Sequence, residues 1–223
     1  MYDVKKSLHA VLDTLPSGVR LVAISKFHPG EYIEAAYAEG QRIFGESHEQ
    51  ELRVKHEQLP KDIEWHFIGH LQTNKVKYIA PYVSMIEAVD SLKLLQEINR
   101  QAERCGRVIR VLLELHIAEE ATKYGLTLDA CRELLEGGEW RSMTQVQICG
   151  LMMMASFVDD QEQIRREMQT AADFFDEVKM KYFVNDDAFC ERSWGMSDDY
   201  RIACETRSTM VRIGTAIFGP RIY

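Results

Sequence analysis

Short apolar runs alternate with helical patterns along the 223-residue chain. Runs rich in Val, Ile, Leu and aromatic residues predict buried strands, at residues 20–25, 42–45, 65–68, 83–88, 108–116, 146–152, 192–195 and 210–213. Between them, apolar residues at steps of three and four predict helices with one apolar stripe. The clearest stripes are Leu92, Leu95, Ile98 and Ala102, and Ile164, Met168, Ala171, Phe175 and Val178.

This order of elements predicts an α/β fold. Repeated β–α alternation is typical of a parallel sheet with helices outside. Eight such units favour a single closed (β/α)8 barrel of the TIM type over an open doubly wound sheet. An amphipathic segment at residues 3–12 predicts an extra N-terminal helix, and Ser91 and Ser197 are predicted helix N-caps. Since no linker, low-complexity tract or long repeat interrupts residues 1–223, we expect a single domain.

Composition narrows the function classes. Lys plus Arg total 27 against 35 Asp plus Glu, and a net charge of −8 argues against non-specific nucleic-acid binding. The longest apolar run, residues 149–158, is shorter than the roughly 20 residues that cross a membrane. The N-terminus shows no pattern of a secretory signal. Five cysteines without a C-x-x-C pair favour the reducing cytosol.

Lys26 is the first residue with candidate chemistry. In a TIM-type barrel the active face lies at the C-terminal ends of the strands, and Lys26 follows the first apolar run. A partly desolvated lysine has a lowered pKa, and its neutral amine can form a Schiff base with an aldehyde. The alternative is the solvated start of a loop.

The ends of the last two predicted strands suggest a phosphate site. Ser197, Gly214 and Thr215 lie where such barrels bind phosphate through backbone N–H groups and hydroxyls. Asp198 and Asp199 would then have to point away from the anion. The alternative is helix capping by Ser197 and a simple turn at Gly214.

A Schiff-base lysine and a phosphate site together suggest pyridoxal 5′-phosphate, the commonest phosphorylated aldehyde cofactor. Arg212, at the end of the last strand, has only hydrogen-bond donors and stays protonated. If it faces the pyridine nitrogen, that nitrogen must be unprotonated, and the ring is then a weak electron sink. The alternative is an arginine on the surface or in a barrel layer.

Five blocks of residues carry a family resemblance. They are VAISK at 22–26, FGE at 44–46, WHFIGHLQTNK at 65–75, GMSDD at 195–199 and STMVRIGTAIFG at 208–219. The chain resembles the pyridoxal phosphate homeostasis proteins, the YggS-like or PROSC-like family, whose fold is similar to the barrel domain of alanine racemase. The resemblance covers the whole chain in order.

The resemblance implies that Lys26 carries pyridoxal phosphate covalently, as an internal aldimine. It also implies the other cofactor-binding residues: Ser47, Met196, Ser197, Arg212, Gly214 and Thr215, with Lys123, His66 and Asn74 as secondary candidates. The family is thought to buffer and deliver the cofactor for vitamin B6 and amino-acid homeostasis, and it has no established catalytic reaction. Recipients would be apo-enzymes that use pyridoxal phosphate, and we expect a cytoplasmic monomer or weak dimer.

Three positions depart from the family pattern. Ser47 replaces the usual Asn, His70 replaces a frequent Pro, and Trp194 replaces the usual Met. Ser47 puts any ring contact from that side chain in question. Trp194 would either narrow the pocket or pack in the barrel.

A different enzyme and a metal-binding protein are the two other candidate functions. The alternative enzyme is an amino-acid racemase or lyase, which needs acid/base groups on both faces of the substrate Cα. Alanine racemases take one of these groups from a C-terminal β-domain, and we expect none here because the chain stops at Tyr223. A metal site is not expected, because His66 and His70 do not share a helical face. The carboxylates at other strand ends, Glu46, Glu87 and Asp90, are too few.

Overall fold

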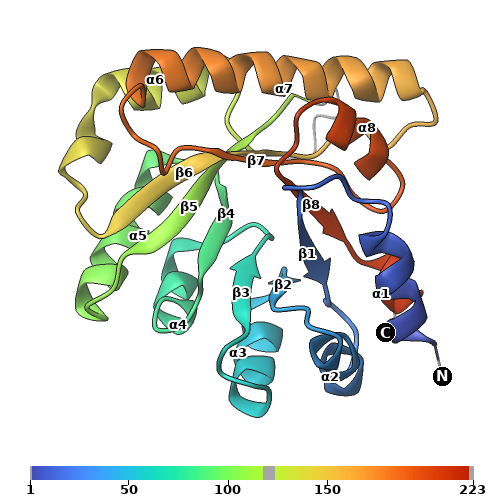
Figure 1. Cartoon of the computed structure of the whole chain (residues 1–223). Helices are drawn as coiled ribbons and strands as arrows, with labels where there is room; N and C mark the ends of the chain where they lie inside the picture. Colours follow the sequence, from blue (N-terminus) through green and yellow to red (C-terminus); the bar gives the residue numbers. More distant parts are fainter. Residues whose placement is uncertain (1, 118–123, 221–223) are drawn as a thin grey trace.

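The computed structural model describes residues 2–117 and 124–220. The described strands are parallel and close into a barrel in sequence order, β1 to β8 (Figure 1). Their bounds are β1 Arg20–Ile24, β2 Ile43–Glu46, β3 Glu64–Phe67, β4 Met85–Val89, β5 Ile109–Leu115, β6 Val146–Met153, β7 Glu191–Ser193 and β8 Met210–Ile213. The predicted (β/α)8 barrel is confirmed, and each predicted strand boundary lies within about two residues of the observed one.

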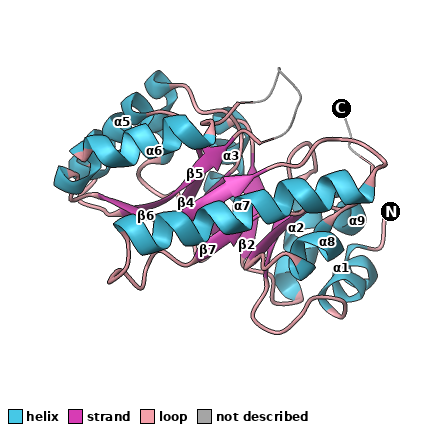
Figure 2. Ribbon diagram, turned by 90° about the horizontal axis from the view of Figure 1, so that it is seen from above, coloured by secondary structure: helices cyan, strands magenta, loops and turns pink. Residues whose placement is uncertain are grey.

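Helices surround the barrel (Figure 2). They are α1 Val4–Leu12, α2 Gly30–Ala38, α3 Glu49–Gln58, α4 Val76–Ile79, α5 Leu92–Arg104, α6 Leu128–Gly137, α7 Gln161–Tyr182, α8 Tyr200–Glu205 and α9 Thr215–Phe218, with 3-10 turns η1 Thr73–Lys75 and η2 Glu139–Ser142. The predicted stripes of α5 and α7 are buried, apart from the partly buried Leu92. Ser91 caps α5 as predicted, because its side chain accepts a hydrogen bond from the Leu94 N–H.

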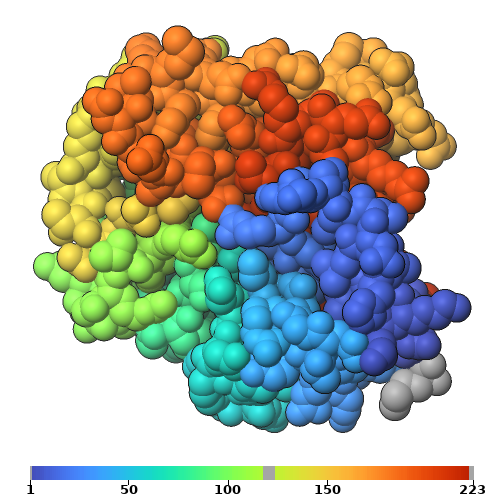
Figure 3. Space-filling view, viewed as in Figure 1, coloured from blue at the N-terminus to red at the C-terminus, as the bar shows by residue number. Residues whose placement is uncertain are grey.

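The two ends of the described chain meet where the barrel closes. Strand β1 pairs with β8, with Val22 opposite Arg212. Helix α1 packs against α9, so N-terminal (blue) and C-terminal (red) segments lie side by side in Figure 3. Among the described residues, no helix is both long and apolar enough to cross a membrane.

The interior of the barrel changes from apolar to polar toward the C-terminal ends of the strands. Val22, Met85 and Leu112 belong to an apolar cluster inside the barrel, distinct from the larger core under the helices. Because successive strand residues point to opposite faces, Met210 and Arg212 both point inward from β8. In the polar layer Arg212 donates a hydrogen bond to Ser193, Ser193 donates one to Glu87, and Glu87 is hydrogen-bonded to His66.

Trp194 packs in the core outside the strands. Its side chain is fully buried among the residues between sheet and helices, and it does not line the cavity described below. The tryptophan therefore fills the core and leaves the width of the cavity unchanged.

Candidate cofactor-binding site

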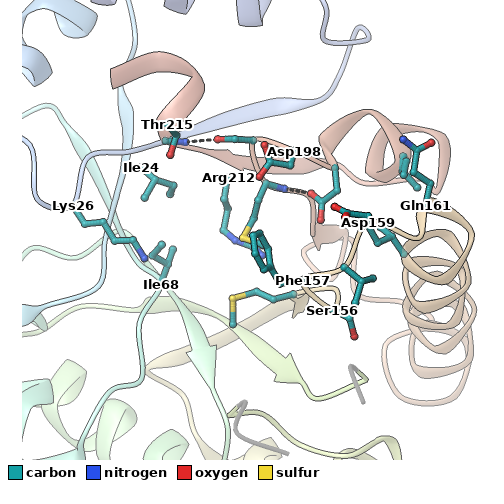
Figure 4. Close-up of a pocket in the computed structure, with 18 of the residues that line it drawn as sticks. Ile24, Lys26, Ile68, Ser156, Phe157, Asp159, Gln161, Asp198, Arg212 and Thr215 are labelled. Carbon is teal, nitrogen blue, oxygen red and sulfur yellow. Dashed lines mark hydrogen bonds between the residues drawn. The ribbon is translucent and has the colours of Figure 1, made fainter. Parts of the chain in front are cut away.

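A cavity of about 530 Å³ opens at the C-terminal ends of β1, β6, β7 and β8 (Figure 4). It brings together six predicted site residues from three separate segments: Lys26, Met196, Ser197, Arg212, Gly214 and Thr215. These three segments lie side by side because β7, β8 and β1 are consecutive around the closed barrel.

Lys26 enters the cavity from the corner that follows β1. The preceding residue, Ser25, is fully buried and donates a hydrogen bond from Oγ to Oε1 of Glu46, 2.6 Å away. Phe27, the following residue, has a left-handed backbone with φ of 64°, which is uncommon for a residue with a Cβ. This sharp corner directs Lys26 into the cavity, where its side chain extends toward Ile68 in Figure 4.

Hydrogen-bond donors converge at one end of the cavity, where the sequence predicts the phosphate site. The N–H groups of Gly214 and Ala216 both point to Oγ of Ser197, at 3.3 and 3.5 Å, and Thr215 adds a second hydroxyl. A phosphate oxygen can replace the hydroxyl oxygen as acceptor for these N–H groups, so the donor set fits a phosphate. The prediction that Ser197 caps a helix is wrong, because the N-cap position of α8 is Asp199.

Two glycines allow the backbone to approach closely here. A Cβ on Gly195, whose φ is +96°, would lie 2.5 Å from Cβ of Ala203. A Cβ on Gly214 would lie 3.1 Å from the Ile24 carbonyl oxygen. Both positions therefore favour glycine.

The two aspartates beside this end have different surroundings. Asp199 is buried and accepts a hydrogen bond from the Met196 N–H at 2.5 Å, so one of its carboxylate oxygens is turned to its own loop. Burial raises the pKa of Asp199, and the Met196 hydrogen bond and the Arg212 charge oppose this. Asp198 lines the cavity (Figure 4). Asp199 lines the same cavity, so the requirement that both aspartates point away from a bound phosphate stays a prediction.

Arg212 is held rigidly in the cavity wall. Its Nη1 donates to the carbonyl and Oγ of Ser193, both at 2.7 Å, and its Nη2 donates to the carbonyl of Met153 at 2.8 Å. Burial lowers the pKa of Arg212, while Glu87 opposes this, and the guanidinium stays a cation at neutral pH. Within the described residues, Nε–H and one Nη2–H make no hydrogen bond, which leaves donors for a ligand.

Glu87 explains how Arg212 is held and what His66 does. Oε1 of Glu87 lies 2.6 Å from Nδ1 of His66, and Oε2 accepts the Ser193 hydroxyl at 2.6 Å. Burial alone would raise the pKa of Glu87, but His66, Arg212 and the hydroxyl hold it below its ordinary value. His66 therefore contacts Glu87 inside the barrel and does not line the cavity. From the sequence, Glu87 is considered only as a metal ligand. A carboxylate inside an apolar strand could have indicated that Glu87 is a buried residue that supports the site.

The remaining predicted residues lie away from the cavity lining. Ser47 packs against Gly69, where an added Cβ would lie 2.4 Å from the Ser47 carbonyl oxygen. Asn74 is exposed on η1, and Lys123 lies outside the described residues. The described part of the chain contains no group of three or more His, Cys, Asp or Glu side chains that could hold a metal ion.

Comparison with known proteins shows the family of the chain. The family model for the N-terminal domain of alanine racemase matches residues 4–221. A pyridoxal phosphate homeostasis protein from Aquifex aeolicus is 37% identical over 205 residues, which cover 92% of this chain and 88% of that protein.

Two solved structures show the same fold. PipY from Synechococcus elongatus, solved with pyridoxal phosphate bound, is 32% identical with a TM-score of 0.87, covering 97% of this chain and all of that chain. Alanine racemase from Clostridium difficile has a TM-score of 0.73 at 14% identity, covers 98% of this chain and 56% of the racemase, and supports the fold alone. The chain therefore belongs to the pyridoxal phosphate homeostasis protein family, on the fold of the alanine racemase N-terminal domain.

Proposed function

We propose that the chain binds pyridoxal 5′-phosphate in this cavity, and that it buffers and delivers the cofactor for vitamin B6 and amino-acid homeostasis. One observation carries the proposal: an amine, a buried guanidinium and a convergent set of N–H and hydroxyl donors line a single cavity. The names of the relatives and the ligand of PipY support the same cofactor.

Each cavity residue has a distinct role in this proposal. When bound, pyridoxal 5′-phosphate supplies an aldehyde that amines attack and a pyridine ring that can withdraw electrons. Lys26 forms the covalent C=N bond through its neutral amine, with loss of water. Ser197, Thr215 and the N–H of Gly214 bind the phosphate, with Met196 beside them. Ser47 is also proposed as a cofactor-binding residue, and Lys123, His66 and Asn74 are the secondary candidates.

Arg212 favours holding the cofactor over catalysis. Because a guanidinium only donates hydrogen bonds, it pairs with an unprotonated pyridine nitrogen and leaves the ring a weak electron sink. Its bonds to Ser193 and Met153 fix the guanidinium in the cavity wall, which supports this role. We therefore propose a carrier, with a racemase or lyase as the alternative.

The covalent step has a direct test. Purified protein given pyridoxal phosphate should turn yellow, and borohydride should fix the label on Lys26. Lys26→Ala should abolish both signals. Lys75→Ala is the matched control, because Lys75 lies on η1 outside the cavity lining and should leave them intact. A colourless wild type, or a label on another lysine, would overturn the proposal.

Carrier and enzyme can be separated in deuterated water. Exchange of the α-proton of alanine or serine at enzymatic rates, lost in Lys26→Ala, would establish the racemase or lyase and refute a pure carrier. Delivery predicts that an apo-enzyme receives cofactor faster than the loaded protein releases it into solution. If transfer is no faster than release into solution, direct delivery is excluded and buffering remains the proposed function.

The setting of this function is part of the proposal. All five cysteines are free thiols, which suits a reducing cytoplasm. We propose that residues 1–223 act as a single cofactor-binding domain, as a monomer or weak dimer.

A further inference from the structure

The backbone on both sides of Lys26 is tied to a buried ion network under helix α3. Lys55 of α3 is only 6% exposed. Its ammonium contacts the Ser25 carbonyl at 2.7 Å, Oε1 of Glu46 at 2.8 Å and Oε1 of Glu51 at 2.6 Å. An ammonium has three N–H donors, so these acceptors use all of them.

Glu51 completes the attachment on the other side of Lys26. The same Oε1 that binds Lys55 also accepts the N–H of Phe27 at 2.7 Å. On the preceding side, Ser25 is held twice, through its carbonyl by Lys55 and through its hydroxyl by Glu46. The network thus holds both neighbours of Lys26, Ser25 and Phe27, by hydrogen bonds.

The corner needs such support because its conformation is unfavourable. Phe27 has a φ of 64°, a region that side chains with a Cβ avoid. Strained residues persist only where surrounding contacts hold them. The hydrogen bond to Glu51 is a charge-assisted contact at the strained residue itself.

We propose that Glu51 and Lys55 are positioning residues for Lys26, which they hold turned into the cavity without touching a ligand. Neither residue lines the cavity. They act through Ser25 and Phe27, whose backbone orientation decides where the lysine side chain begins. This inference rests on the proposed function, since it assigns a supporting pair to the proposed cofactor lysine.

Glu49 offers a matched control on the same helix. Glu49 and Glu51 both lie in the first turn of α3, and each pairs with a lysine, at 2.7 Å for Lys75 and 2.6 Å for Lys55. Their side chains are 17% and 22% exposed. Among the described residues only Glu51 also contacts the corner, so a loss specific to Glu51 reports on Lys26 and not on ion pairing by α3.

The test compares Glu51→Ala, Glu51→Gln and Glu49→Ala, with two readouts. The first is pyridoxal phosphate affinity from the visible absorption. The second is hydrogen exchange of the Phe27 amide in cofactor-free protein. Glu51→Ala should weaken binding about tenfold, since a bond to a charged group is lost, and speed exchange at Phe27. Glu51→Gln retains an acceptor for Phe27 and should recover most of the affinity. Glu49→Ala should change neither readout.

Lys55→Met provides an independent variant that releases Ser25. It should also weaken binding, so if either α3 variant fails to fold, the other decides. Equal losses in Glu51→Ala and Glu49→Ala would overturn the inference, as would wild-type affinity in Glu51→Ala. If wild type itself does not bind at Lys26, the proposed function fails, while exchange at Phe27 still reports whether Glu51 holds the corner.

Discussion

Two buried hydrogen-bond networks flank the cavity. Each has a glutamate at its centre, and the pKa values of the two glutamates are shifted in opposite directions. The interior network, inside the barrel, comprises His66, Glu87, Ser193 and Arg212. The outer network, between the barrel and α3, comprises Ser25, Glu46, Glu51 and Lys55. Both central glutamates are fully buried, yet the pKa of Glu87 is lowered and that of Glu46 is raised.

The difference comes from the partners, because burial disfavours the charge at both sites. Glu87 faces His66, the Arg212 cation and a hydroxyl, which together outweigh its desolvation. Glu46 shares Lys55 with Glu51, and that second carboxylate adds repulsion to desolvation. We conclude that Glu87 is built to stay charged and hold Arg212, while Glu46 tolerates protonation and serves to anchor the corner at Lys26.

The largest expected effect follows removal of the charge on Glu87. Glu87→Gln removes the negative charge that lies 3.9 Å from Nη1 of the buried Arg212, and the break of a buried ion pair costs about 3–5 kcal/mol. The free energy of unfolding in urea measures this loss. Glu49→Gln, at a more exposed pair, should cost under about 1 kcal/mol. Similar losses in both variants would show that the charge on Glu87 contributes no more to stability than the charge on Glu49.

Glu114 supplies a third buried carboxyl, on β5, that should make stability depend on pH. Burial, reinforced by Asp90 and opposed by Arg212, raises its pKa to about 7 from an ordinary 4.5. The unfolded chain releases this proton first, so the stability contribution is complete below pH 4.5 and is lost as pH rises to about 7.

Glu114→Gln removes that titration. Its stability relative to wild type should rise between pH 4.5 and 7 by about 3 kcal/mol and then level off, since each pKa unit is worth about 1.4 kcal/mol. Urea unfolding at pH 5 and pH 8 measures the change. A difference that is constant across this range would show that Glu114 titrates normally.

The same substitution, Ser→Ala, can be made in each network, at Ser193 in the interior network and at Ser25 in the outer network. Oγ of Ser193 donates to Glu87 and accepts from Arg212, so Ser193→Ala should cost about 1.5–3 kcal/mol. Among the described residues, Oγ of Ser25 makes one hydrogen bond, to Glu46, and Ser25→Ala should cost about 1 kcal/mol. Thermal and urea unfolding rank the pair, and the reverse ranking would contradict the comparison.

Glu46→Gln should have a small effect, comparable to that of Ser25→Ala. The amide oxygen of Gln can still accept from Ser25 and Lys55, so the loss should be about 1 kcal/mol. Because the pKa of Glu46 is raised, wild type loses stability as pH rises, and the cost of the substitution should be smaller at pH 8 than at pH 6. A larger cost at pH 8 would show that Glu46 needs its charge.

Local patterns were enough to predict much of the site. The short apolar runs of the strands and the steps of three and four on the helices predicted the barrel confirmed here. Once a barrel is predicted, the ends of its strands must lie on one face. Lys26, Ser197 and Arg212 could therefore be placed together although they are far apart in the chain.

The supporting residues could not be predicted in this way. The hydrogen bond between Ser193 and Glu87 joins positions 106 residues apart, and Lys55 binds Ser25 across 30 residues. A buried polar side chain must find partners, but sequence spacing does not say which ones. Trp194 is a similar case, since only packing showed that it fills the core.

The sequence by itself determined the barrel and the residues at its C-terminal face, because hydrophobic periodicity is local and barrel closure follows from strand count and order. The tertiary structure alone decided which buried charges hold Arg212 and the corner at Lys26. The physical reason is that desolvated charges are stabilised by the donors within hydrogen-bond reach in three dimensions, and the folded barrel brings those donors from distant parts of the chain.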